Sequence, residues 1–322
     1  MPIMNMAEAI NNALHQAMVD DDSVLVLGQD VGINGGVFRV TDGLFKKFGS
    51  ERVYDTPLAE SGMIGCSIGL GMTGFKPVVE MQFSDFMSNG FHMLIYHASK
   101  LRNRTRGRFH VPIVIRAPVQ GGIHALEHHS ESMEGIYAAI PGLKIVMPSN
   151  PYDAKGLLLA AIDEPDPVIF FEPKKLYRIS KQEVPDEKYK VDIGKANVVQ
   201  EGKELTIITW GSMVRESLAA VSLAKASIEV IDLRSLSPWD IETVCASVRK
   251  TRRAIVVSEA PRSFGISGEI AATLSEKLVL SLDAPIKRVT GYDIPYPYFS
   301  KENIYLPDAN RILNAINEVL SF

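Results

Sequence analysis

The chain has 322 residues, of which 46% are hydrophobic and 22% are charged, and its formal net charge at pH 7 is −4. This length exceeds the size at which one core usually keeps growing, so two domains are expected, and the composition excludes a disordered or low-complexity chain. A slightly acidic chain gives no reason to expect nucleic acid or an anionic membrane as partner, so we expect a small molecule or a protein.

The first residues and the two cysteines indicate the compartment. Residues 4–10 pass directly into an amphipathic pattern, without the apolar core of a signal peptide or the Arg-rich character of a transit peptide. No run of about 18 apolar residues predicts a membrane span. Cys66 and Cys245 lie far apart, which argues against a disulfide framework and against a CxxC redox or zinc site. We therefore expect a reducing compartment, the cytoplasm.

Short apolar runs typical of buried parallel strands recur through the first half of the chain. Longer segments with helical periodicity lie between these runs, and this alternation is typical of an α/β fold. We therefore predict an α/β domain over residues 1–180, with an open sheet and flanking helices. The predicted strands are residues 24–27, 78–81, 113–115, 144–147 and 168–171.

A polar stretch around Pro185 has no clean period, and we interpret residues 181–193 as a linker. A second, smaller α/β domain is predicted over residues 194–322. The segment Ser237-Pro238-Trp239-Asp240 predicts a helix start there, with a capping hydroxyl, a proline in the first turn and an acid that suits the helix dipole. The predicted strands are residues 205–208, 228–231 and 254–257.

Glu60 is the strongest candidate for chemistry, since ligands of open α/β sheets lie beyond the carboxyl ends of strands. It stands at a predicted strand-to-helix junction, and Gly62, Gly65 and Gly69 leave one face of the following helix bare for close approach. Apolar surroundings would raise the pKa of Glu60 and suit a proton-shuttling acid. The alternative is that Glu60 only complements the positive end of a helix.

Two further motifs are interpreted as coincidental. Residues 69–74 fit the GxGxxG dinucleotide pattern but close a helix instead of joining a strand to one, so NAD is not expected on this chain. His124 and His128 have the spacing of a helical zinc pair. They follow Gly121-Gly122 in a predicted loop, without the HExxH order or a third ligand. A zinc hydrolase is thus a remote alternative, one that requires stoichiometric zinc.

Several segments together resemble the beta subunits of the E1 component of 2-oxo acid dehydrogenases, which are transketolase-like and depend on thiamine diphosphate. The resemblance spans essentially the whole chain. Within that family, residues 170–178 and 228–260 are most similar to the branched-chain 2-oxo acid enzyme. The segments that carry the resemblance are residues 55–65, 80–86, 129–132, 141–146, 169–173, 229–234 and 289–293.

The resemblance implies an N-terminal pyrimidine-binding domain, a transketolase C-terminal domain and a set of site residues. Glu60 would hydrogen-bond N1′ of the aminopyrimidine and favour the tautomer that deprotonates thiazolium C2, so that the cofactor attacks and decarboxylates the 2-oxo acid. His129 would be a catalytic histidine, acting on the carbonyl-derived oxygen or in reductive acylation of a lipoyl group. Leu58, Gln82 and Phe86 would contact the cofactor, Phe86 by stacking. Without the resemblance, Phe86 is more typical of a core residue.

A missing motif indicates a partner. Enzymes of this cofactor hold Mg²⁺ through a Gly-Asp-Gly sequence followed by Asn, and the chain contains none. The resemblance implies that an alpha subunit supplies this half, in a heterotetramer of two alpha and two beta subunits. It also implies an E2 lipoyl acyltransferase that docks on the C-terminal domain, in the region of Tyr292, Asp293 and Phe322. The chain alone is expected to be inactive.

The family also carries a structural potassium ion. The positions that match it in this chain are Ile113, Ala161, Glu164 and Asp166. The alternatives to a branched-chain enzyme are a pyruvate or acetoin dehydrogenase beta subunit, and a catalytically silent assembly subunit. The joint presence of Glu60, Phe86 and His129 argues against a silent subunit.

Overall fold

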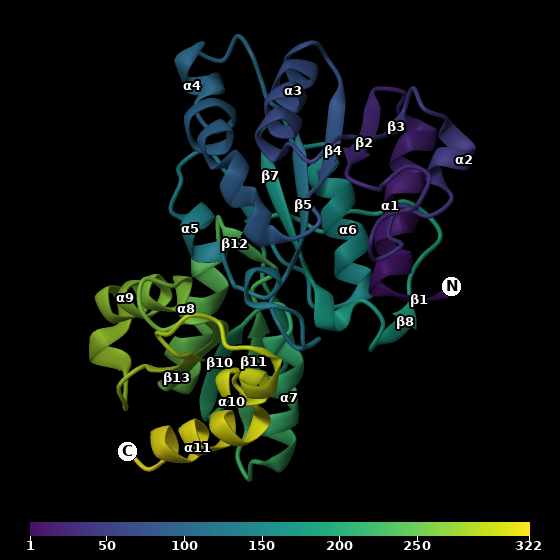
Figure 1. The fold of residues 1–322 in the computed structure, drawn as a ribbon. Coiled ribbons are helices and arrows are strands. Elements are labelled where there is room, and N and C mark those ends of the chain that lie inside the picture. Colours follow the sequence, from purple (N-terminus) through teal and green to yellow (C-terminus); the bar gives the residue numbers. More distant parts are fainter.

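A seven-stranded sheet with helices on both faces forms most of the first half of the chain in the computed structural model, which describes residues 1–322 (Figure 1). Its order is β12-β6-β7-β5-β4-β2-β3, and only β12 runs antiparallel to its neighbour. Burial on both faces explains the near-continuous apolar runs. All five strands predicted here are confirmed. The strands are β2 (Val24–Gly28), β3 (Val53–Asp55), β4 (Lys76–Glu80), β5 (Val114–Val119), β6 (Lys144–Val146), β7 (Val168–Pro173) and β12 (Ser235–Ser237).

The helices of this half divide between the two faces of the sheet, and each face has its own apolar core. Helices α1 and α6 pack side by side on one face, and α3 and the segments around it cover the other (Figure 1). Asn5 caps α1, since its side chain accepts from the Glu8 amide at 3.0 Å while the Glu8 carboxylate accepts from the Asn5 amide at 2.7 Å. The helices are α1 (Met6–Asp20), α2 (Leu44–Phe48), α3 (Glu60–Met72), α4 (Leu101–Arg104), α5 (Glu134–Ala138) and α6 (Pro151–Ile162).

The connection at residues 181–193 is anchored along its length. Its first residues form β8 (Lys181–Glu183), which pairs antiparallel with β1 (Ile3–Asn5). The buried Lys155 ammonium on α6 then donates to three successive carbonyls, those of residues 185, 186 and 187, at 2.6, 3.3 and 3.2 Å. The first part of this connection is therefore held against the first half of the chain and does not form a free linker. The division of the chain at 181–193 stays a prediction.

A five-stranded sheet forms the second half, in the order β14-β13-β10-β11-β9, with β9 alone antiparallel. The three predicted strands are confirmed. The strands are β9 (Asn197–Gln200), β10 (Leu205–Thr209), β11 (Ile228–Asp232), β13 (Ala254–Pro261) and β14 (Lys287–Gly291). The helices are α7 (Met213–Leu223), α8 (Ile241–Thr251), α9 (Ile266–Leu278), α10 (Glu302–Tyr305) and α11 (Ala309–Leu320). None of the helices combines the length and apolar character that crossing a membrane requires.

The predicted start of α8 is wrong in its detail. Ser237 and Pro238 precede the helix, and Ser237 belongs to β12, which pairs with β6 of the first sheet. The cap is Asp240, whose carboxylate accepts from the Thr243 amide at 3.1 Å. The Ser237-Pro238 sequence looked like a helix cap. The pairing of β12 with the first sheet leaves no signal in the local sequence, so it could not be predicted there. This crossing strand and a core cluster of 34 residues drawn from both halves join the two sheets.

Candidate active site

The candidate site lies where adjacent parallel strands of the first sheet end. In an open α/β sheet the loops at the carboxyl ends meet in one crevice, so residues far apart in sequence come together there. Glu60 follows β3, Phe86 follows β4, and His129 lies in the loop after β5. The same edge also receives residues that sequence analysis did not select, namely Gln29 and Asp30 after β2, Phe83 after β4 and Lys174 after β7.

Glu60 is the first residue of α3 and is half-buried. Its carboxylate accepts from two side-chain amides, Gln29 Nε2 and Asn89 Nδ2, each at 3.3 Å. The prediction of apolar isolation is therefore wrong for the single chain, because the ends of two other elements bring amides to the carboxylate. Those amides orient Glu60, and its partial exposure leaves it accessible to a ligand.

One wall of the site consists of three aromatic rings, those of Phe83, Phe86 and His129. The Phe86 ring meets the Phe83 and His129 rings edge-on, with centroids 5.6 and 5.2 Å apart, and the Phe83 and His129 rings are 4.4 Å apart. Phe86 is only half-buried, so it is not an ordinary core residue. The structure thus brings the predicted Phe86 and His129 together, and it adds Phe83. A ring wall of this kind suits a flat heterocycle.

His129 has the character of a proton-transfer group. Burial, and then the neighbouring His128, lower its pKa from the usual value, against the opposing effect of Asp85. The Nδ1 atom of His129 is buried and has no hydrogen-bond partner within the chain. Buried polar atoms normally have a hydrogen-bond partner, so this unpaired nitrogen is unusual and makes His129 a candidate for proton transfer.

The other two predicted cofactor residues, Leu58 and Gln82, make no hydrogen bond to Glu60 and do not belong to the ring wall. Leu58 is 80% exposed on the loop that precedes α3. Gln82 donates to the Asp30 carboxylate at 3.1 Å, so the end of β4 is tied to the end of β2. Both residues stay predictions as cofactor contacts, Leu58 on a surface that a partner would have to cover.

Beneath the site, a buried ion-pair group fixes the strands that carry it. The Arg116 guanidinium on β5 donates to Glu80 on β4 at 2.7 Å and to both carboxylate oxygens of Glu172 on β7 at 2.7 and 3.0 Å. Burial raises the pKa of Glu80, against the opposing effect of Arg116. Losing the arginine would leave two buried carboxylates without their cation, which is strongly destabilising in proteins. Three neighbouring strands are therefore locked in register.

The residues predicted to hold potassium do not form a free site. The Glu164 carboxylate is paired with the Lys144 ammonium, and Asp166 with Arg102 at 2.5 Å. The carbonyls of Ile113 and Ala161 each accept a backbone amide, at 3.0 and 3.2 Å. A cation here would compete with two existing ion pairs, so the potassium site stays a prediction without structural support. No group of three or more His, Cys, Asp or Glu residues in the structure is arranged to hold a metal.

The two motifs interpreted as coincidental are the GxGxxG segment at residues 69–74 and the pair of His124 and His128. The GxGxxG segment closes α3, and Gly74 ends it with a positive φ of 100°. The predicted bare face of α3 is open at Gly69, where an added Cβ would meet nothing within 4 Å, whereas a Cβ added at Gly65 would lie 3.8 Å from the Met93 sulfur. The Nδ1 atom of His124 lies 2.9 Å from Glu302 in the second half of the chain.

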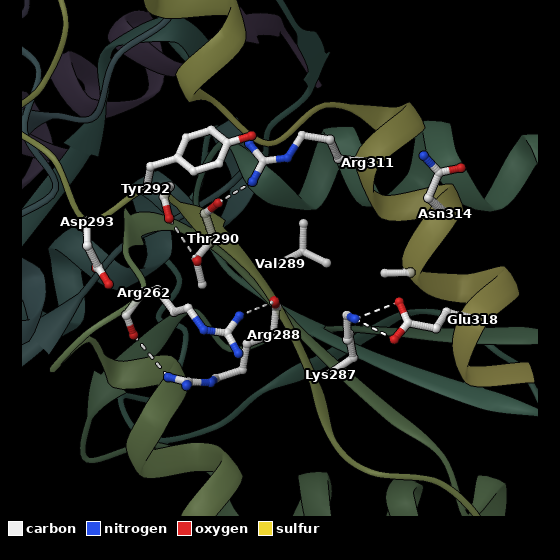
Figure 2. A pocket seen from close by; sticks show the side chains of 12 residues that line it. Arg262, Lys287, Arg288, Val289, Thr290, Tyr292, Asp293, Arg311, Asn314 and Glu318 are labelled. Atoms are coloured by element: carbon white, nitrogen blue, oxygen red, sulfur yellow. Dashed lines mark hydrogen bonds and ion pairs between the residues drawn. The ribbon is translucent and has the colours of Figure 1, made fainter. Parts of the chain in front are cut away.

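A separate hollow of about 440 Å³ lies between β14 and α11, away from this site (Figure 2). Its lysine, Lys287, is paired with Glu318 at 2.5 Å. Arg262 and Arg288 each donate to the other's backbone carbonyl, at 3.3 and 3.0 Å. None of the candidate site residues lines this hollow.

Comparisons with known proteins identify the families of both halves of the chain. Residues 3–180 match the family "Transketolase, pyrimidine binding domain" and residues 194–312 match "Transketolase, C-terminal domain". The pyruvate dehydrogenase E1 component subunit beta of Acholeplasma laidlawii is 50% identical over 99% of this chain and 98% of that protein. The same subunit of Staphylococcus epidermidis is 51% identical over 99% of both chains.

A solved structure shares the fold. It is described as "Split gene transketolase, inactive beta4 tetramer" and matches with a TM-score of 0.80 at 20% identity, over 99% of this chain and 98% of that one. Its likeness supports the predicted architecture of two open α/β sheets with flanking helices. The family matches and the curated relatives go further, and the chain therefore belongs to the transketolase-like beta subunits of the E1 component of 2-oxo acid dehydrogenases.

Proposed function

We propose that this chain is the beta subunit of a thiamine-diphosphate-dependent pyruvate dehydrogenase and binds the pyrimidine end of the cofactor. The observation that carries the proposal is the contact of the Phe86 and His129 rings, 5.2 Å apart, with Phe86 on the segment whose Asn89 donates to the Glu60 carboxylate at 3.3 Å. The names of relatives about 50% identical over nearly the full length support pyruvate as the substrate.

The residues present fit a flat, nitrogen-containing ring. When bound, the cofactor supplies the carbanion chemistry and electron sink that decarboxylation of a 2-oxo acid needs. Glu60, oriented by Gln29 and Asn89, would hold a proton at a ring nitrogen. Phe86 would contact the ring face and exclude water, while the free nitrogen of His129 would accept or deliver a proton at the substrate.

The site is one half of a shared site in this proposal. The chain carries no Gly-Asp-Gly motif, and Leu58 and the bare face of α3 stand exposed beside Glu60. An alpha subunit would hold the diphosphate and Mg²⁺ and cover this edge, in a heterotetramer of two alpha and two beta subunits. The acyl group would then pass to the lipoyl arm of an E2 acyltransferase.

The finer substrate assignment differs from the one that the sequence suggested. Residues 170–178 and 228–260 favoured a branched-chain 2-oxo acid, whereas the relatives from Acholeplasma laidlawii and Staphylococcus epidermidis carry the pyruvate dehydrogenase name. We therefore place pyruvate first and the branched-chain acid second. An acetoin dehydrogenase subunit and a catalytically silent subunit are the remaining alternatives.

The test is decarboxylation by this chain assembled with its alpha partner, thiamine diphosphate and Mg²⁺, with pyruvate and with 3-methyl-2-oxobutanoate. We expect a higher kcat/KM for pyruvate, and no turnover by either subunit alone. Glu60→Gln keeps the shape but removes the carboxylate, so we expect kcat to fall by about 10²–10⁴, the usual contribution of a positioned acid or base.

The matched control is Glu51→Gln, an exposed position beside β3 that should leave kcat unchanged. Exchange of the C2 proton on bound thiamine diphosphate gives a second readout, and it should slow in Glu60→Gln but not in Glu51→Gln. Full turnover by the Glu60 variant would refute its role. Preference for the branched acid would reverse the substrate order, and a silent wild-type complex would favour an assembly role.

A further inference from the structure

The loop that carries His129 begins with backbone amides that point into the second half of the chain. Residues 120–124 follow β5 and include three residues with positive φ, at 68° for Gln120, 87° for Gly122 and 57° for His124. Non-glycine residues rarely adopt this conformation, so the surrounding structure must hold them in it. The holding contacts come from far away in the sequence.

Two buried carboxylates supply these contacts, Glu259 at the end of β13 and Glu302 at the start of α10, which are 1% and 0% exposed. Glu302 accepts from the amide of Gly122 at 2.8 Å and from the amide of His124 at 2.9 Å. Glu259 accepts from the amide of Gly121. We call Glu259 and Glu302 the carboxylate clamp.

The clamp is itself held in place from several sides. The Tyr296 hydroxyl donates to Glu302 at 2.8 Å, and the Ser212 hydroxyl donates to Glu259 at 3.0 Å. The buried Lys174 ammonium, on the first-half side, donates to the Gln120 carbonyl. A Cβ added at Gly121 would lie 1.8 Å from the Tyr296 hydroxyl oxygen and 2.9 Å from the Glu302 carboxylate, so the loop backbone packs directly against the clamp and the tyrosine that holds it.

The far end of the same loop is held by contacts with the first half. The amide of Glu131 donates to Asp85 at 3.2 Å, and the His129 ring packs against Phe83 and Phe86. The position of His129 is therefore set by one anchor in each half of the chain. The clamp accepts from three backbone amides of the loop, those of residues 121, 122 and 124, whereas Asp85 accepts from one, so the clamp makes the larger number of hydrogen bonds.

We propose that Glu302 and Glu259 are positioning residues for the proposed reaction, which hold residues 120–124 and thereby place His129 at the cofactor site. The inference rests on the proposed function, because it assumes that His129 acts in catalysis. The second half of the chain contributes no residue to the candidate site. In this proposal it nevertheless controls whether His129 is placed for the reaction.

The experiment uses the assembled enzyme with Glu302→Gln and, as an independent variant, Glu259→Gln. Each change keeps the side-chain shape but places an amide against backbone N–H donors. We expect amide hydrogen exchange of peptides covering 120–129 to rise by about tenfold or more, as expected when charged hydrogen bonds are lost. We expect kcat to fall by a similar factor, with KM and the Kd for thiamine diphosphate within about twofold.

The matched control is Glu318→Gln, which changes a carboxylate of the same half that is paired with Lys287 at the surface (Figure 2). It should alter neither exchange at 120–129 nor kcat. Unchanged loop exchange in both clamp variants would overturn the proposal, and so would faster exchange with an unchanged kcat. If the wild-type enzyme turned over no 2-oxo acid, the proposed function would fail, while the exchange data would still decide whether the carboxylates hold the loop.

Discussion

At the scale of single residues, the candidate site shows how far a side chain's role depends on neighbours from other elements. Glu60 was identified in the sequence because a carboxylate at a helix start stands before a run of glycines. The amides of Gln29 and Asn89 that orient it were not identified, since both are 29 or more residues away and carry no local pattern. Sequence therefore located the acid, and packing determined its surroundings.

The pH dependence of the proposed reaction should report His129. Because its pKa is lowered, the imidazole is still neutral, and able to accept a proton, at pH values below the usual pKa of about 6.5. It loses this ability as the pH falls through the lowered pKa. We expect the acidic limb of kcat/KM for pyruvate to have its midpoint below that value.

His128→Ala gives the directional test of this assignment. The second cause of the lowered pKa is the charge of His128, so removing it should raise the pKa of His129 and move the limb to higher pH. His129→Ala should remove the limb and lower kcat by about 10²–10⁴. A limb that persisted in His129→Ala would assign the titration to another group.

At the scale of elements, helix starts illustrate both a success and a failure of local patterns. The amphipathic pattern that begins near Met4 predicts α1, and the structure adds a complete capping box between Asn5 and Glu8. The segment before α8 has an equally good serine and proline pattern, yet the capping residue is Asp240 because Ser237 pairs with the first sheet. Local capping signals hold only where no strand pairing competes for the same backbone.

The capping box gives a quantitative prediction for α1. Asn5→Ala removes the side-chain acceptor of the Glu8 amide, so we expect the free energy of unfolding to fall by about 1 kcal/mol. The same change at Asn314, which is exposed in the interior of α11, should shift it by no more than about 0.5 kcal/mol. Urea unfolding of the two variants measures the difference, and equal shifts would contradict the capping account.

At the scale of the whole molecule, shared strand pairing, core packing and hydrogen bonds join the two halves into one packed structure. Strand β12 of the second half lies in the first sheet, the largest core cluster spans both halves, and the carboxylate clamp crosses between them. Trp210 adds a further link, since its buried indole N–H donates to Glu134 at 3.2 Å. These contacts bury apolar and charged groups that neither half could cover alone.

We therefore expect the purified chain to unfold in a single transition. Far-UV circular dichroism follows both sheets, whereas tryptophan fluorescence follows the surroundings of Trp210 and Trp239, which belong to the second half, with Trp210 at its contact with the first. In urea the two signals should coincide, as they do when unfolding is cooperative. A fluorescence change that preceded the loss of circular dichroism would mean that the second half unfolds on its own.

The sequence by itself determined the α/β class, the eight predicted strands and the position of Glu60 at the head of α3. Each of these follows from periodicity or from residue types close in the chain, which act before any tertiary contact forms. Only the tertiary structure decided the Arg116 ion pairs, the ring wall around His129 and the clamp that joins Gly122 to Glu302 across 180 residues. Such contacts depend on which strand ends and loops meet, and that depends on the packing of the whole chain.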